Sequence, residues 1–247
     1  MYAIFAKELR SLFLSPLAWS LLLAMQLLLA WLFLVQLEQF LQIQPKLAGM
    51  ENAPGVGQLV IAPLLDSSAV ILLLLIPLLS MGMFSREASN GTLNLLFSSP
   101  VSTSAIVLGK YLALLALLAI MLLMIALMPI SLLLGTAPDM GTLAAALLAL
   151  ALAMASYAAL SLWISSLTQQ PAVAAVLSCT LLFLLWIINL TGSGEISPLM
   201  EQLSLSSHFQ RMLSGLVTSA DITYFLLLTS VSLLLCIHRI ERLRVDG

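Results

Sequence analysis

Long apolar runs separated by short polar stretches dominate the chain. Six of these runs approach or exceed the roughly 20 helical residues that cross a hydrocarbon core of about 30 Å. In lipid every backbone polar group must be paired within the protein, which favours helices, and the short alternating strands of a barrel do not occur in the sequence. We therefore predict six transmembrane helices, at residues 17–37, 59–84, 106–134, 143–167, 172–190 and 222–238.

The composition indicates that lipid is the main solvent of this protein. Of the 247 residues, 62% are hydrophobic and only 8% are charged, whereas a soluble domain carries about 25% charged residues. So few charges cannot cover a water-exposed surface of this size. The predicted fold class is all-α, a polytopic membrane helix bundle that forms one transmembrane domain over residues 1–247. The net charge of −2 gives no sign of a nucleic-acid partner.

The basic residues are unevenly divided between the two sides of the predicted bundle. If the N-terminus is cytoplasmic, seven Lys and Arg residues lie on the cytoplasmic side and two on the other. Cytoplasmic loops carry such an excess, so we predict that both termini are cytoplasmic. The seven are Lys7, Arg10, Arg86, Lys110, Arg239, Arg242 and Arg244, and the two are Lys46 and Arg211.

The first 15 residues have the pattern of an interfacial helix. Between positions 2 and 14 the apolar side chains fall on one helical face, and Lys7, Arg10 and Ser11 fall on the other. We predict a helix that ends before Pro16 and lies on the inner leaflet, with Lys7 and Arg10 toward the lipid phosphates. A disordered leader is the alternative.

The sequence lacks the residues that enzymes and coupled carriers need. No Walker A pattern and no His-Glu-x-x-His pattern occurs. His208 and His238 lie at opposite ends of the last predicted span, in or near water, so they cannot share a metal. No carboxylate with a partner is visible inside a span. We therefore expect no catalytic residue, metal or cofactor in this chain, and a membrane enzyme or an oligomeric channel is disfavoured. Energy for any driven work must come from another chain.

Polar residues in and after the later spans predict packing and capping. Ser156, Tyr157, Ser161 and Ser165 form a weak stripe on the fourth span, which we attribute to helix–helix hydrogen bonds. The outer segment 191–221 has apolar residues spaced for one helical face, and we predict short helices there that dip into the outer leaflet or cap the bundle.

A polar break at residues 85–103 separates the second and third spans. Gly91 permits a tight turn, and Thr92 is a suitable N-cap for a short helix. Leu93, Leu96 and Phe97 recur at i, i+3 and i+4, and Pro100 ends the helix. The apolar face of this helix either enters a groove on a cytosolic partner or lies on the lipid interface. Beyond the break, Ser102, Thr103 or Ser104 caps the next span, and Lys110 is expected to snorkel to the membrane interface.

The break also carries a motif. The pattern Glu87-x-x-x-Gly91-Thr92-Leu93-x-x-Leu96-x-x-Ser99-Pro100-Val101-Ser102 resembles the signature of ABC-2 type transporter permeases, the membrane subunits of type-2 ABC exporters. The starts of the first and third spans, the end of the fourth and the outer segment are similar too. The likeness covers nearly the whole chain and is nearest the gliding-motility and copper-enzyme-maturation permeases.

The resemblance implies partners and a role. A six-span permease pairs with a second copy or a paralogue, and each permease binds one ATP-binding cassette ATPase, which holds the ATP and Mg, through the loop after span two. Residues 195–216 would be re-entrant helices that close the outer end. The matching positions assign the coupling helix to Glu87, Gly91, Thr92, Leu93, Leu96 and Pro100, and Phe97 shares its apolar face.

The expected function is export across a bacterial inner membrane by a non-catalytic permease subunit. The alternative is a non-transporting subunit that passes ATP-driven motion to a periplasmic or envelope partner. A wide continuous cavity favours transport, and a tightly packed dimer seam favours mechanotransmission. Because this chain carries no large extracellular domain, an accessory periplasmic protein would supply any module that receives the substrate.

Overall fold

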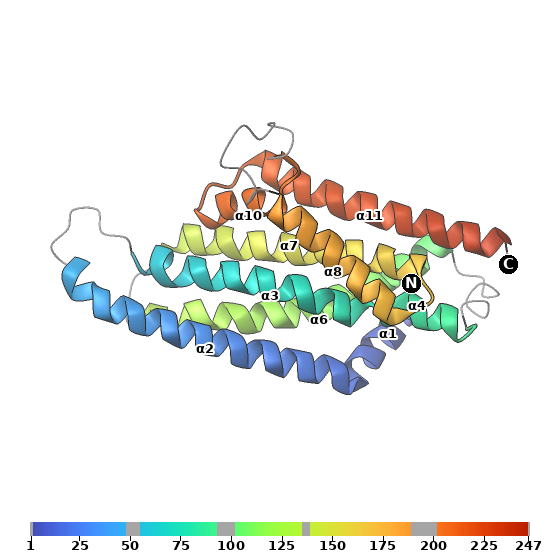
Figure 1. The fold of residues 1–247 in the computed structure, drawn as a ribbon, viewed down its shortest axis with the longest axis horizontal. Helices are drawn as coiled ribbons and strands as arrows, with labels where there is room; N and C mark the ends of the chain where they lie inside the picture. Colours follow the sequence, from blue (N-terminus) through green and yellow to red (C-terminus); the bar gives the residue numbers. More distant parts are fainter. Residues whose placement is uncertain (1, 48–54, 93–101, 135–138, 189–201, 247) are drawn as a thin grey trace.

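The described part of the protein is a bundle of helices (Figure 1). The computed structural model describes residues 2–47, 55–92, 102–134, 139–188 and 202–246. Within these ranges every regular element is helical. The elements are α1 (Tyr2–Leu14), α2 (Pro16–Leu47), η1 (Gly57–Ile61), α3 (Ala62–Ser80), α4 (Gly82–Ser89), α6 (Thr103–Ser131), η2 (Leu132–Leu134), α7 (Met140–Leu167), α8 (Pro171–Ile187), α10 (Leu205–Leu213) and α11 (Ser219–Asp246).

The helices confirm a polytopic bundle. Five segments of the described chain are long and apolar enough to cross a membrane, and α8, with 17 residues, is a shorter apolar helix. Residues 189–190 of the predicted fifth span lie outside the described residues. The long helices run alternately up and down, so both chain termini lie at one end of the bundle, at the right in Figure 1. We call this the terminus end, and the opposite end the far end.

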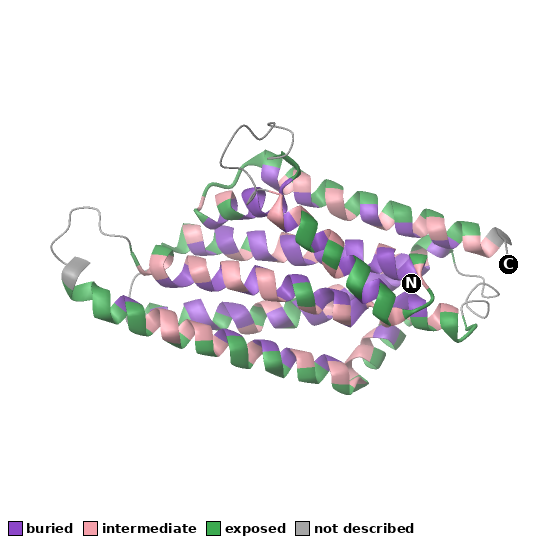
Figure 2. Cartoon of the chain, in the orientation of Figure 1, coloured by how far each residue is buried: buried purple, intermediate pink, exposed green. Residues whose placement is uncertain are grey.

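Helix α7 lies at the centre of the bundle. It packs against α3, α6, α8, α10 and α11. Small side chains make this possible, because Ala149, Ala153 and Ala158 are fully buried and let neighbouring backbones approach closely. Figure 2 shows that buried residues concentrate on α3 and α7, whereas α2, α8 and α11 carry much exposed surface. The large apolar side chains exposed there, such as Trp31 and Leu234, suit a lipid environment.

The interfacial helix predicted at the N-terminus is present as α1. It ends at Leu14, and Ser15 alone separates it from α2. The corner is fixed by the Trp19 indole, whose Nε1 donates a hydrogen bond of 2.7 Å to the Phe13 carbonyl. Helix α1 then packs along α6. Its depth in a membrane stays a prediction.

The second apolar segment is broken between α3 and α4, and α7 bridges the break. The first N–H groups of a helix have no partner within it. At the start of α4, Ser165 Oγ accepts hydrogen bonds from the N–H groups of Phe84 (3.2 Å) and Ser85 (3.4 Å), and it donates one to the Met81 carbonyl (2.8 Å). Helix–helix bonding, predicted for the polar stripe of this span, is therefore confirmed at Ser165.

The other members of the stripe behave differently. The Ser156 hydroxyl donates to the Ala153 carbonyl of its own helix at 2.8 Å, so the expected helix–helix bond is wrong there. The Tyr157 hydroxyl and Ser161 Oγ are buried and have no hydrogen-bond partner within the described residues. The polar stripe thus correctly predicted a face of α7 that is buried in the bundle. It did not predict the hydrogen-bond partner of each hydroxyl, which depends on the neighbouring helix.

We predict that Ser165→Ala lowers the free energy of unfolding by about 1–3 kcal/mol, because it leaves buried backbone groups of the α3–α4 break unpaired. The apparent unfolding temperature in one detergent measures this loss. Ser156→Ala is the matched control, since that hydroxyl is equally buried but bonds only its own helix. Equal losses in the two variants would contradict the assigned role.

Candidate functional site

Three of the predicted coupling residues are described, and all three lie at the terminus end before residue 93. Glu87 is in α4, Gly91 and Thr92 follow Asn90 after the end of α4, and α6 begins at Thr103. Residues 93–101 lie outside the described residues. The predicted helix with Leu93, Leu96, Phe97 and Pro100 is therefore not tested.

A turn at Gly91 precedes residues 93–101, and a helix N-cap at Ser102 follows them. Gly91 has a φ of 69°, the left-handed region that glycine adopts most readily, so the predicted turn is confirmed. The Thr92 hydroxyl donates back to the Glu87 carbonyl at 3.3 Å. On the other side, Ser102 is the N-cap of α6, as predicted, and its Oγ accepts from the Ala105 N–H at 3.4 Å.

A buried lysine joins the two flanks of the loop. The Lys110 Nζ of α6 donates to Glu8 Oε1 of α1 and to Glu87 Oε1 of α4, each at 2.9 Å. Its third bond, of 2.8 Å, goes to the Met83 carbonyl, and the Phe84 ring centroid lies 5.1 Å away. We call Lys110, Glu8, Glu87 and the Met83 carbonyl the ion node.

The ion node differs from what the sequence led us to expect. Lys110 does not snorkel to an interface, because its side chain is only 1% exposed. Burying an ammonium costs several kcal/mol unless it is paired and hydrogen-bonded. The three bonds here match its three N–H donors. Three separate helices must therefore be in place before Lys110 can be buried.

The two other cations predicted at the membrane interface are exposed. Lys7 Nζ lies 3.5 Å from Glu8 Oε1 and 3.6 Å from Glu87 Oε1, so it borders the ion node with its side chain 63% exposed. Arg10 is exposed on α1. Because pairs open to water contribute little, Lys7 adds charge balance rather than much stability.

Glu8 is the member of the ion node that sequence reasoning missed. It falls between Phe5 and Leu12 at helical spacing, so a carboxylate stands on the otherwise apolar face of α1. Such a carboxylate needs a buried cation, and Lys110, several residues into an apolar span, is the counterpart. Glu8 on an apolar helix face and Lys110 in an apolar span were the two features of the sequence from which this ion pair could have been predicted.

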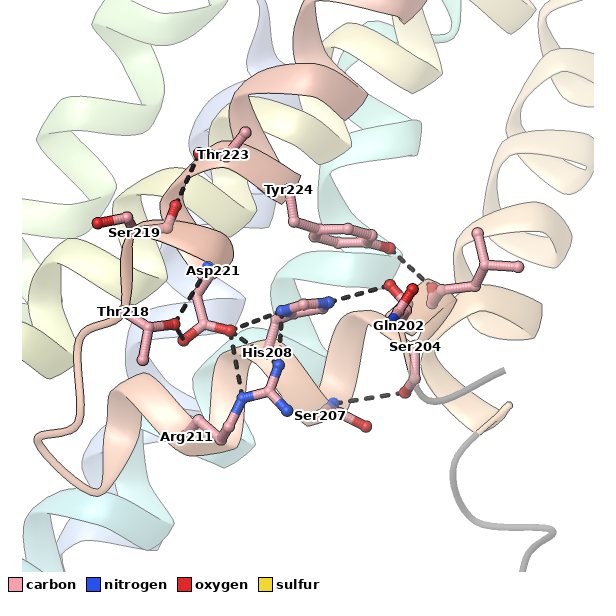
Figure 3. A network of polar contacts seen from close by, with 11 residues as sticks. Gln202, Ser204, Ser207, His208, Arg211, Thr218, Ser219, Asp221, Thr223 and Tyr224 are labelled. Carbon is pink, nitrogen blue, oxygen red and sulfur yellow. Dashed lines mark hydrogen bonds and ion pairs between the residues drawn. The ribbon is translucent and has the colours of Figure 1, made fainter. Parts of the chain in front are cut away.

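A second polar cluster occupies the far end (Figure 3). Asp221, fully buried at the start of α11, accepts from Arg211 Nη2 at 2.9 Å and from the Thr218 hydroxyl at 2.5 Å. His208 Nδ1 of α10 lies 2.6 Å from the same carboxylate. We call His208, Arg211, Thr218 and Asp221 the far-end cluster. It fastens the short helix α10 to the beginning of α11.

The far-end cluster corrects two expectations. His208 does not lie in or near water, because it is buried, and the Tyr224 ring stacks on it at 4.2 Å. Its Nε2 lies 3.0 Å from the Gln202 carbonyl oxygen. A carboxylate with partners also exists within a candidate span, namely Asp221.

A cavity of about 810 Å³ lies beside α10 at the far end. Helices α2, α7 and α10 and the turn η1 enclose it, with apolar walls and a few amide and hydroxyl groups. Asp139 stands at its edge, where the hydroxyl and N–H of Thr142 and the N–H of Gly141 hold the pKa of the carboxyl below its usual range. Among the described residues, no group of three or more His, Cys, Asp or Glu could hold a metal ion.

Comparison with known proteins supplies the family. The model of the ABC-2 family transporter proteins matches residues 2–242. The chain belongs to the ABC-2 transporter family. A search among curated proteins gave no match.

Family membership defines the protein in general terms. The chain is a multi-pass membrane protein and the permease subunit of an ABC transporter, a membrane transport component whose family implies an ATP-binding cassette ATPase as partner. The resemblance to this family is thereby confirmed, whereas the branch, the docking loop and the direction of transport stay predictions.

We predict that Asp221→Asn lowers the free energy of unfolding by about 1.5–3 kcal/mol, because Arg211 loses the carboxylate that it contacts. Thermal unfolding in detergent checks this. Glu241→Gln removes an exposed carboxylate from the other end of α11 and serves as the control. A stability loss in the control as large as that in Asp221→Asn would show that Asp221 has no special role.

Proposed function

We propose that this permease exports a substrate with energy from an ATP-binding cassette ATPase that docks on the loop between α4 and α6. The observation that carries the proposal is the ion node. It joins Glu87, two residues before the end of α4, to Lys110, seven residues after the start of α6. A loop held between two connected helices is suited to receive a partner and to pass on its motion.

The energy source must be a second protein. The sequence holds no Walker A pattern, so this chain lacks that means of binding ATP and Mg. In the proposal the ATPase binds both. The apolar side chains of Leu93, Leu96 and Phe97 enter a groove of the ATPase, and Pro100 ends the docking helix.

The packing of one copy bears on where a substrate would pass. Along the middle of the bundle, side chains such as Leu72, Leu114 and Leu150 are fully buried, so the described residues fill the interior. The cavity of about 810 Å³ is confined to the far end and has the size of a small-molecule pocket, roughly 300–1,000 Å³. We therefore place a substrate path between two permease copies or paralogues, in the bacterial inner membrane.

The filled interior also supports a second candidate function. A subunit that only passes ATP-driven motion to a periplasmic or envelope partner needs no path through its own helices. The two candidates differ in what ATP hydrolysis produces: movement of a substrate across the membrane, or movement of an accessory protein at the far end. Both use the same docking loop.

Gly91→Pro and Leu96→Asp are expected to abolish ATP-driven transport while the protein still inserts. Proline cannot adopt the positive φ of Gly91, and aspartate places a charge on the docking face. Co-purification of the ATPase and its stimulation by the permease measure the effect. Gly91→Asn is the control, because asparagine tolerates the left-handed region. Normal capture and stimulation of the ATPase in both Gly91→Pro and Leu96→Asp would refute docking here.

We also predict that the terminus end is cytoplasmic. With Cys179 and Cys236 replaced by serine, a single cysteine at Asn90 should resist a membrane-impermeant maleimide in intact cells and react after the cells are opened. A single cysteine at exposed Ser214, at the far end, should react in intact cells. The reverse pattern would invert the orientation.

A further inference from the structure

We propose that Lys110 is a positioning residue that passes the motion of the docking loop to the interfacial helix α1. The inference rests on the proposed function, because it needs an ATPase that moves the loop. Its basis is the three-way geometry of the ion node. One ammonium contacts the helix before the loop, belongs to the helix after the loop, and holds a carboxylate of α1.

The direct contact between α1 and α4 is loose. A space of about 90 Å³ lies between them, lined by Ser11 of α1 and by Gly82 and Arg86 of α4. The Lys110 ammonium holds Glu8 of α1 and Glu87 of α4 at the same distance. A displacement of α4 therefore reaches α1 through Lys110 rather than through close helix packing.

The structure around α1 allows it to respond. Helix α1 is 13 residues long, and Ser15 and the hydrogen bond from Trp19 to the Phe13 carbonyl connect it to α2. Glu8 is its only buried residue, and Lys110 Nζ holds that residue from the inside of the bundle. Because α1 packs along α6, the helix that carries Lys110, a movement of the ion pair shifts α1 relative to α4.

Lys7 provides a matched contrast. It approaches the same two carboxylates, but at 3.5 and 3.6 Å and with its side chain largely in water. Water and salt weaken such a pair, whereas the enclosed Lys110 pairs are shielded from both. Of the two lysines, we therefore expect only Lys110 to move Glu8 when Glu87 moves.

The test uses the permease in complex with its ATPase in lipid nanodiscs. Cys179 and Cys236 are replaced by serine, and one cysteine carries an environment-sensitive fluorophore, either at Asn90 beside the loop or at Ser11 on α1; both positions are exposed. The emission shift on adding ATP and vanadate is measured in the otherwise unchanged protein, in Lys110→Met and in Lys7→Met. Glu8→Leu, which keeps a branched side chain of similar size but cannot accept a hydrogen bond from Lys110, is the second variant if Lys110→Met does not fold.

With Lys110 and Lys7 intact, we expect a shift at both labels. In Lys110→Met, or in Glu8→Leu, the shift at Ser11 should be lost while the shift at Asn90 persists, and in Lys7→Met both should persist. A merely structural Lys110 would leave the Ser11 shift in every folded variant, and that result overturns the inference but leaves the proposed function standing. No shift at Asn90 even with Lys110 and Lys7 intact would overturn both.

Discussion

The burial of one ammonium group among two carboxylates is the constraint on which the terminus end of this protein depends. A chain with few charges and mostly apolar helices can enclose Lys110 only if its cost of desolvation is offset by well-placed acceptors. Those acceptors come from α1 and α4, so both helices must lie within reach of the Lys110 side chain of α6. The two flanks of the proposed docking loop are held together as a result, because they are the helices that the ion node joins.

Elsewhere in the bundle, too, one polar side chain contacts several partners. Ser165 uses one hydroxyl to pair three backbone groups where α3 gives way to α4. Asp221 gathers Arg211, His208 and Thr218 at the far end. Between these points the described interior is filled by alanine, leucine and other apolar side chains. Hydrogen bonds and ion pairs thus fix the ends and the break, whereas close packing of small residues holds the middle.

This distribution fits a permease that draws energy from a partner. The terminus end carries the ion node, helix α1 and the flanks of the proposed docking loop, and the far end carries α10 and the cavity. The connection between the ends is the continuous helical path of α6, α7 and α11. Packed helices transmit displacement as nearly rigid bodies because their interior has little free volume.

The sequence by itself determined the features that depend on neighbouring residues. Apolar runs located the membrane helices, Pro16 the start of α2 and Gly91 the left-handed turn, since each depends on local backbone geometry. The sequence narrowed the cap of α6 to residues 102–104, and the structure shows that it is Ser102. Only the tertiary structure decided where Lys110, Glu8 and His208 lie. Their partners are chosen by which helices become neighbours, and Lys110 and Glu8 are separated by 102 positions along the chain. A local pattern cannot specify such a pairing, so it assigned Lys110 to the interface and His208 to water, whereas helix packing buried both.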